Sequence, residues 1–303
     1  MALFNTYVEM GIKQAPKQRP ILDLILEESP ILGALPTMEA STATQNVFQT
    51  VKSVVGDDLR ALDAPSTNTS AETALERVDL SVIDGVIEVG ADTVDLLGMD
   101  IAFGQKEPLI IKKTMMNTEY SLYYDNLLAS ALASGNYQLA GGSSNTNYSM
   151  VAVHYEVGEN IGLISPNGVF GKGTMFDFKS IHNGSEYKNE NGIWVYGKKF
   201  KTLFGMQTNN PQRISAIVNI DIINNNIPTI KQLANMLLNC EAGQNTVIYC
   251  HPAVLTAIGY THKMNFMNLF AESSAISTQV EAFNKTPFVT SYNLKNGTEA
   301  NIA

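Results

Sequence analysis

Polar and apolar positions first alternate regularly at residue 45. Side chains of the two kinds alternate from Gln45 to Val54, and a second alternating stretch runs from Leu75 to Val89. A period of two is typical of a β-strand in a two-faced ribbon. The intervening residues 56–73 are rich in Asp, Ser, Thr and Asn, which favour turns. The pattern therefore predicts a long hairpin with a polar tip.

The tip of this hairpin is the first predicted contact with another chain. A two-stranded hairpin is marginally stable alone in water, so we expect it to lie on a neighbouring subunit. Charged side chains sit at the tip among the turn-forming residues. The predicted contact residues there are Asp57, Asp58, Arg60 and Asp63.

The first 43 residues hold short apolar patches, at 21–26 and 31–35, without a sustained helical or strand period. Prolines remove backbone donors and favour extended geometry. The prolines are Pro16, Pro20, Pro30 and Pro36. We therefore expect an extended arm that lies on another surface, and a folded core that survives its removal through Pro36. The arm residues predicted to contact a neighbouring subunit are Ile21, Leu24, Ile31 and Leu32.

The longest helical pattern runs from about Gln105 to Ser134, with apolar residues at three- and four-residue spacing. Pro108 is tolerated in a first turn, and Gly135 supplies a C-terminal stop. A helix of this length forms a spine across the subunit; an ordinary core helix is the alternative.

Strands and helices mix in the remaining sequence. Strands are predicted at 150–157 and 193–223, with Asn191-Gly192 as a hairpin turn. Thr229 is a helix N-cap before an amphipathic stripe. Further elements are a strand at 247–249, a short helix at 251–260 opened by Pro252, and a strand at 287–292.

Composition narrows the function classes. The 303 residues carry a net charge of −9, and the basic residues form no cluster, which disfavours a tight nucleic-acid binder. The sequence has no leader pattern and no apolar run of the roughly 20 residues that cross a bilayer, so we expect a cytoplasmic product. In that compartment Cys240 and Cys250 are expected to be buried thiols.

Candidate catalytic and metal-binding patterns fail on spacing. The segment 168–174 is rich in glycine and holds Lys172, but it lacks the spacing of a phosphate loop and is predicted to be a turn. No Gly-x-Ser-x-Gly elbow occurs. The histidines His154, His182, His251 and His262 lack the spacing of a zinc site. We expect no catalytic residue, no cofactor and no metal.

Three sequence blocks carry a resemblance to a known family. A hydrophobic strand at 150–154 leads to Gly162-Leu-Ile-Ser-Pro166-Asn-Gly168. The second block comprises Tyr196, Phe200, Gly205-Met206 and Ile217-Val-Asn219-Ile220-Asp221. The third comprises Phe283-Asn-Lys-Thr-Pro287-Phe288-Val289 and Glu299. In this order, after an arm, a long hairpin and a long helix, they resemble the major capsid proteins of tailed double-stranded DNA phages, most closely the compact group of short-tailed phages.

The resemblance implies an α+β protein with the Hong Kong 97-type capsid fold. The implied parts are an N-terminal arm at 1–44, an extended hairpin loop at 45–90, a peripheral domain with the spine helix at 91–145, and an axial domain with returning peripheral strands at 146–303.

It also implies that the chain assembles with itself, as hexamers and pentamers, into the icosahedral shell of a virion. The chain would be made in the cytoplasm of a bacterial host. Implied partners are a portal protein, an optional decoration protein, and packaged DNA bound without sequence specificity; no membrane is implied. Because no scaffold-like helical segment precedes the arm, we expect a separate scaffolding protein.

Two other readings stay open at this point. One is an encapsulin-like nanocompartment subunit, which shares the fold and encloses an enzyme cargo. The other is a phage tail or adhesion protein that binds carbohydrate through the strands at 141–228, although that reading leaves the arm and the long helix without a role.

Overall fold

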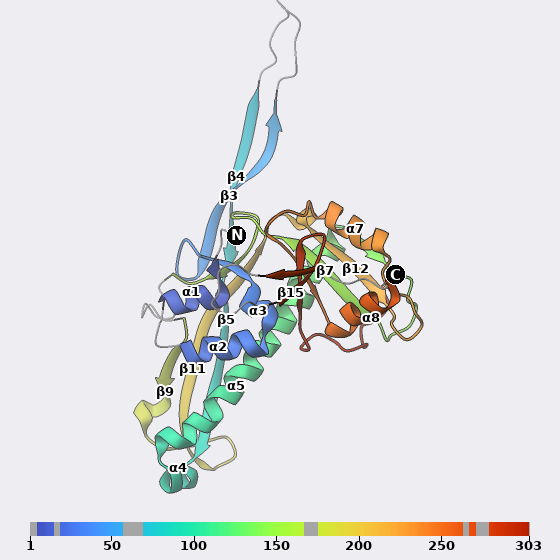
Figure 1. The fold of residues 1–303 in the computed structure, drawn as a ribbon. Helices are drawn as coiled ribbons and strands as arrows, with labels where there is room; N and C mark the ends of the chain where they lie inside the picture. The colour runs from blue at the N-terminus through green and yellow to red at the C-terminus, as the bar shows by residue number, and fades with distance from the viewer. Residues whose placement is uncertain are drawn as a thin grey trace, which may run out of the picture.

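The computed structural model of the chain describes residues 5–14, 19–56, 69–166, 175–262, 267–270 and 279–302. Three parts are visible in Figure 1: an elongated body at the lower left, a compact body at the right, and a ribbon that projects upward. Within the described residues, the strands form two seven-stranded sheets and one separate two-stranded ribbon.

The elongated body is built around the long strand β11, and we call its sheet the β11 sheet. β5 pairs antiparallel with β11 on one side, while β8 and β9 pair with it on the other. The strands of this sheet are β1 (Asn5–Thr6), β2 (Pro36–Glu39), β5 (Ser81–Gly90), β8 (Asn160–Ile164), β9 (Asp177–Ser180), β10 (Tyr187–Lys188) and β11 (Trp194–Thr208). The predicted turn at Asn191-Gly192 joins β10 to β11, and Gly192 has a φ of 77° there.

The compact body contains the second sheet, which we call the β7 sheet. Its order is β14-β15-β16-β13-β7-β12-β6. Its strands are β6 (Tyr137–Leu139), β7 (Tyr148–His154), β12 (Ile214–Ile220), β13 (Thr246–Cys250), β14 (Met267–Phe270), β15 (Gln279–Phe283) and β16 (Thr286–Thr290). Alternate residues of β7 point to opposite faces of the sheet. On one face, Met150 and Ala152 pack against the helices α7 (Ile230–Asn239) and α8 (Pro252–His262). On the other face, Val151 and Val153 belong to the main core.

The predicted spine helix is confirmed, with an earlier start. α5 (Met99–Ser121) continues through a π-helical turn (Leu122–Leu128) into α6 (Ala129–Ala133). Gly98, at a φ of 81°, separates α5 from α4 (Ala91–Leu97). Pro108 therefore lies inside the helix and not in its first turn.

The N-terminal segment differs from the expected extended arm. It forms three helices, α1 (Tyr7–Gln14), α2 (Arg19–Glu28) and α3 (Pro30–Ala34). Pro20 and Pro30 stand in the first turns of α2 and α3, where a missing N–H leaves no bond unmade, and Pro36 opens a strand. Pro20 and Pro30 thus stand at helix starts and do not prevent helix formation, so the prediction of an extended arm was wrong.

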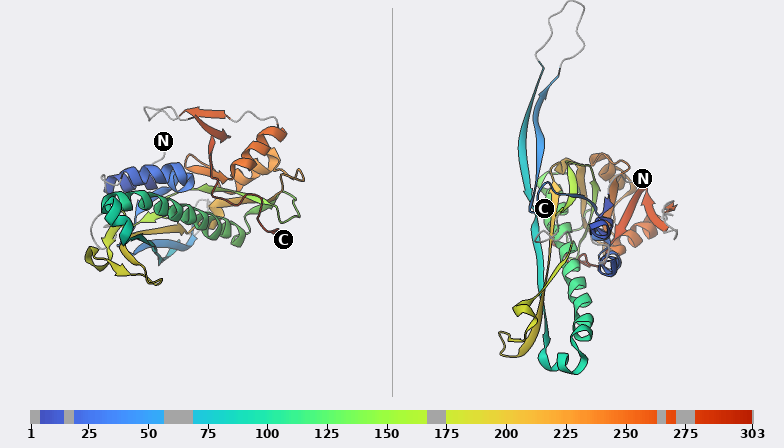
Figure 2. Two further views of the ribbon diagram at one scale, coloured as in Figure 1. Left: turned by 90° about the horizontal axis from the view of Figure 1, so that it is seen from below. Right: turned by 90° about the vertical axis from the view of Figure 1, so that its left-hand side faces the viewer.

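These helices also bury their own apolar residues. α2 packs on α5, and the shared core includes Tyr7, Ile25, Ile31, Leu32 and Leu35, each at most 1% exposed. Figure 2 shows the N-terminal helices lying alongside α5. This packing argues against the expectation that a folded core survives removal of the segment through Pro36.

The predicted hairpin exists but ends earlier than the sequence suggested. β3 (Gln45–Val55) pairs antiparallel with β4 (Ser70–Asp79). The chain then passes Leu80, which is buried with Ile161 and Leu163, and continues as β5 in the β11 sheet. The alternating stretch at 75–89 is thus two strands in different sheets, although both run along one line in Figure 2.

Candidate assembly surfaces

The ribbon formed by β3 and β4 is anchored at its base and open along its length. At the base, the Asn46 side chain donates a buried hydrogen bond to Gln207 Oε1 at 2.9 Å. Farther out, Lys52 and Glu76 form an ion pair across the two strands at 2.6 Å. Apolar side chains on the ribbon lie in solvent. They are Val47, Val51, Val54, Val55 and Leu75, which are 44–76% exposed.

The predicted contact residues of the hairpin tip and of the N-terminal segment fall into three groups. Asp57, Asp58, Arg60 and Asp63 lie outside the described residues. Ile31 and Leu32 belong to the core of their own subunit, so this conformation offers neither side chain to a neighbour. Ile21 and Leu24 are half-buried on α2, and their contact with a neighbour stays a prediction.

A buried carboxylate, Glu119, holds the N-terminal helices to the spine. Its Oε2 accepts hydrogen bonds from the backbone N–H groups of Ile31 at 2.9 Å and Leu32 at 3.3 Å, at the start of α3. Its Oε1 accepts bonds from Asn293 Nδ2 at 2.9 Å and from the Ser291 hydroxyl. Burial raises the pKa of Glu119, and these hydrogen bonds oppose the rise. Sequence reasoning missed this residue, although a glutamate on the apolar face of a helix, four positions after Met115, was an available signal.

A second buried carboxylate, Glu299, joins the π-helical turn to the C-terminal segment. Its Oε1 accepts hydrogen bonds from the Tyr124 hydroxyl at 2.7 Å and from Ser149 Oγ at 2.9 Å. The Tyr123 hydroxyl lies 3.0 Å from the same Ser149 oxygen. Burial raises the pKa of Glu299. Glu299, the acidic residue of the third block that carries the family resemblance, therefore has a structural role, because it joins Tyr124 and Ser149 to the C-terminal segment.

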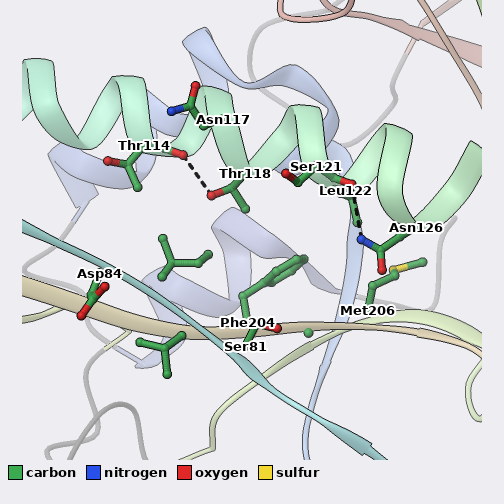
Figure 3. A pocket seen from close by; sticks show the side chains of 13 residues that line it. Ser81, Asp84, Thr114, Asn117, Thr118, Ser121, Leu122, Asn126, Phe204 and Met206 are labelled. Carbon is green, nitrogen blue, oxygen red and sulfur yellow. Dashed lines mark hydrogen bonds between the residues drawn. The ribbon is translucent and has the colours of Figure 1, made fainter.

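A hollow of about 450 Å³ opens between α5 and the strands β5 and β11. Figure 3 shows Thr114, Thr118 and Ser121 on the helical side and Phe204 and Met206 from β11 on the other side. The Thr114 and Thr118 hydroxyls donate to the carbonyls four residues earlier, at 2.9 Å each, so these short side chains fold back on the helix. Short polar side chains leave the layer between helix and sheet unfilled.

Few ionisable groups line this hollow. Asp84 is the one acidic or basic side chain among its described lining residues, and Lys199 holds it at 3.0 Å. No histidine or cysteine from the described residues lines it.

The cysteines and His251, which were also candidates for chemistry, lie in structural environments. Cys240 and Cys250 are buried thiols, as predicted. His251 Nδ1 accepts a hydrogen bond from the Ala253 N–H at 3.1 Å, at the start of α8. Among the described residues, no three His, Cys, Asp or Glu side chains gather closely enough to hold a metal ion. The segment at 168–174 lies outside the described residues.

None of the described helices is both long enough and apolar enough to cross a membrane.

Comparisons with known proteins place the fold. No family model matches the chain. No curated protein sequence matches it either. Among solved structures, the chain is similar to one from bacteriophage epsilon15, at 14% identity over 88% of each chain and a TM-score of 0.53.

Two other solved structures are more distant. The JBD30 capsid decorated with minor capsid protein trimers has 7% identity over 88% of this chain and 91% of that chain, with a TM-score of 0.47. The SrpI encapsulin of Synechococcus elongatus PCC 7942 has 12% identity over 62% of this chain and 86% of that chain, with a TM-score of 0.45. The likeness to the epsilon15 chain shows the fold, and the predicted α+β architecture of the Hong Kong 97 type is confirmed.

Proposed function

We propose that the chain is the major capsid protein of a tailed double-stranded DNA phage and builds the icosahedral shell around its genome. The observation that carries the proposal is the ribbon of β3 and β4, whose exposed valines and leucine extend from a subunit with a capsid fold. A two-stranded ribbon with apolar side chains in water is stabilised when a neighbour covers it. The role is structural, and we assign no catalytic residue or cofactor.

In this proposal the elongated body is the peripheral domain and the β7 sheet with its two helices is the axial domain. Hexamers and pentamers form around the axial domains, and the ribbon lies over the next subunit. The tip residues Asp57, Asp58, Arg60 and Asp63 then select the neighbour through charged contacts, with Ile21 and Leu24 as secondary contacts. Glu119 and Glu299 keep the two bodies together through the spine helix.

The proposed partners follow from the same role. A separate scaffolding protein guides assembly, a portal protein occupies one vertex, and a decoration protein is an optional outer addition. Packaged DNA contacts the shell without sequence readout, and the acidic net charge of −9 favours its movement during packaging because it gives the wall little attraction for phosphates.

The test is cryo-electron microscopy of the chain expressed together with the products of its neighbouring genes. The proposal expects closed icosahedral shells. Shells from infected cells should also contain nuclease-protected DNA, whereas a copurifying enzyme inside them would indicate an encapsulin-like compartment. A chain that stays a monomer or trimer under these conditions would contradict the proposal and favour a tail or adhesion protein.

A further inference from the structure

The C-terminal segment holds an Asn-Gly pair, Asn296-Gly297, which is one of four such pairs in the sequence. Asn296 is exposed and lines a hollow of about 670 Å³ beside α8, so water reaches its side-chain amide. Gly297 has a φ of 61°, a conformation that glycine adopts without strain. Because glycine has no side chain, the Gly297 nitrogen is unshielded next to the Asn296 side chain.

Tyr148 distinguishes this pair from an ordinary exposed turn. Its hydroxyl donates a hydrogen bond to Asn296 Oδ1 at 2.7 Å. A Cβ at Gly297 would lie 3.2 Å from the same hydroxyl oxygen, so the hydroxyl contacts both residues of the pair. Tyr148 begins β7, and its ring lies 5.5 Å from that of His251. A hydroxyl held in this way polarises the Asn296 carbonyl toward attack, as the donors of an oxyanion hole do.

The backbone nitrogen of Gly297 is the nucleophile in reach of that carbonyl. Within the described part of the chain its N–H makes no hydrogen bond, so no acceptor holds its proton in place. The positions on either side are bound. The Lys295 N–H donates to the Tyr124 hydroxyl at 3.0 Å, and the Glu299 N–H donates to the Asn147 carbonyl at 3.2 Å. Burial also raises the pKa of Tyr148, so its hydroxyl remains a donor at mildly alkaline pH, where backbone amides lose protons faster.

We propose that Asn296 is a self-modification site, at which the folded subunit converts asparagine to aspartate or isoaspartate. The Gly297 nitrogen releases its proton and bonds to Asn296 Cγ, and the negative charge that develops on Oδ1 faces the Tyr148 hydroxyl. The Cγ–Nδ2 bond then breaks, and Nδ2 leaves as ammonia after taking up a proton that replaces the one released by Gly297. Water opens the resulting cyclic imide at either carbonyl carbon. The sum converts asparagine and water to an aspartyl residue and ammonia, and it needs no oxidant or reductant.

The product changes the part of the molecule that attaches the C-terminal segment. Aspartate places a carboxylate in a hollow whose described lining residues include no Asp, Glu, Lys or Arg. Isoaspartate adds a methylene group to the main chain shortly before Glu299, whose backbone pairs with Asn147 and whose side chain accepts the Tyr124 hydrogen bond. The inference goes beyond the proposed shell function and applies to the unassembled subunit.

Asn191-Gly192 is a matched control within the same chain. Both residues are exposed in the turn between β10 and β11, and Gly192 also has a positive φ, of 77°. There the Gly192 N–H donates to the Asn189 carbonyl at 2.9 Å. Among the described residues, no hydroxyl group donates to the Asn191 side chain. The control pair thus shares the dipeptide and its exposure but lacks both features that favour the reaction at Asn296.

Peptide mapping by mass spectrometry measures both pairs in one sample. The full chain is incubated at mildly alkaline pH, either folded or unfolded in urea, and samples are digested with trypsin over time. In the unfolded chain the two pairs should react at similar rates. In the folded subunit Asn296 should react about tenfold faster than Asn191, an effect smaller than that of a dedicated oxyanion hole. Equal rates in the folded subunit, or a slower rate at Asn296, would overturn the inference.

Tyr148→Phe removes the donor and keeps the ring. The rate at Asn296 in the folded subunit should fall about fivefold or more, while the rate at Asn191 and both rates in urea stay the same. Tyr292→Phe is the matched control, because that ring lines the same hollow and is 82% exposed. An unchanged rate at Asn296 in Tyr148→Phe would overturn the inference. If that variant does not fold, the comparison of the two pairs in the unsubstituted subunit still decides.

Discussion

Glu119 and Glu299 are two buried carboxylates that use their oxygens differently. Glu299 accepts the hydroxyl hydrogen bonds of Tyr124 and Ser149 on one atom, Oε1, and the carboxylate accepts a further bond from the Ser149 backbone N–H. Glu119 receives bonds on both oxygens. A glutamine keeps one carbonyl oxygen and replaces the other by an NH₂ donor. The same substitution should therefore cost more at Glu119, which accepts bonds from four donors, than at Glu299.

Glu299→Gln should cost less than Glu119→Gln and should remove a pH dependence. Burial raises the folded pKa of Glu299 above its ordinary value of 4.5, so the unfolded chain loses its proton first as the pH rises. The contribution of Glu299 is complete below pH 4.5 and is lost as the pH rises through the folded pKa. The free energy of unfolding of the variant, relative to the unsubstituted subunit, should thus increase with pH. Urea denaturation of unassembled subunits between pH 4 and about 8 measures this difference.

Glu119→Gln is the contrasting variant in that experiment. Its NH₂ group must face N–H donors that the carboxylate accepts, which leaves buried donors unpaired and costs about 1–3 kcal/mol each. Equal stability of the two glutamine variants would show that the way the hydrogen bonds divide between the two carboxylate oxygens has no effect on stability.

Gly85 on β5 is required by the ring of Phe200. A Cβ at Gly85 would lie 2.6 Å from Phe200 Cζ, and that ring is fully buried with Phe103 on α5. We expect Gly85→Ala to destabilise the subunit by about 1–3 kcal/mol through overpacking. Gly90→Ala on the same strand is the control, because its Cβ would meet nothing nearer than 3.8 Å. Thermal unfolding that changes equally in the two variants would contradict this explanation.

Among the elements, the N-terminal helices form part of the folded core of their own subunit. Deletion of these helices tests that statement. Removal of residues 1–36 takes Tyr7, Ile25, Ile31, Leu32 and Leu35 out of the core. Each such side chain contributes about 1.5–3 kcal/mol, and their sum is comparable to the whole stability of a domain. The truncated chain should lose cooperative unfolding in circular dichroism and become insoluble. A truncated chain that melts cooperatively would contradict the packing described above.

The ribbon should behave in the opposite way, as an element that stabilises the assembly and not the subunit. Val51 and Val54 are 63% and 66% exposed, and threonine retains their β-branched shape. In the double variant Val51→Thr/Val54→Thr, the unassembled subunit should keep its stability to within about 0.5 kcal/mol. Shells should melt at a lower temperature, because each seam loses apolar contact. Scans of subunit and shell at matched salt provide the measurement, and an equal shift in both would place these valines in the subunit's own fold.

Much of the element order could be predicted from the sequence because local chemistry decided it. Thr229 forms the capping box with Gln232, and Pro252 begins α8. The hairpin and the spine helix follow from periods of two and of three to four residues. The N-terminal helices could not be predicted in the same way, because their prolines sit in first turns and their stability comes from packing on α5. Nor could the break at Leu80 be predicted, since a buried contact with Ile161 and Leu163 decides it.

At the scale of the whole molecule, surfaces were harder to predict than elements. The N-terminal residues predicted to contact a neighbouring subunit included Ile31 and Leu32, which are buried in the core of their own subunit. The apolar stripe of α7 was visible in the sequence, but a stripe does not reveal which of its residues face the core. Only the packing of Leu233, Met236 and Leu237 identifies Leu238 as the outer residue.

The shape of the subunit also bears on whether the chain alone can set the size of the shell. The ribbon contacts its own subunit at its base, through Leu80 and the hydrogen bond between Asn46 and Gln207, while its outer valines are exposed. A shell of uniform size needs the same ribbon angle at every seam, and we expect contacts outside the subunit to help set that angle. Expression of the chain alone should therefore give tubes, aggregates or shells of mixed size, and coexpression with a scaffolding protein should narrow the distribution. Electron microscopy of both preparations measures it. Closed shells of one size from the chain alone would show that the subunit itself fixes the curvature.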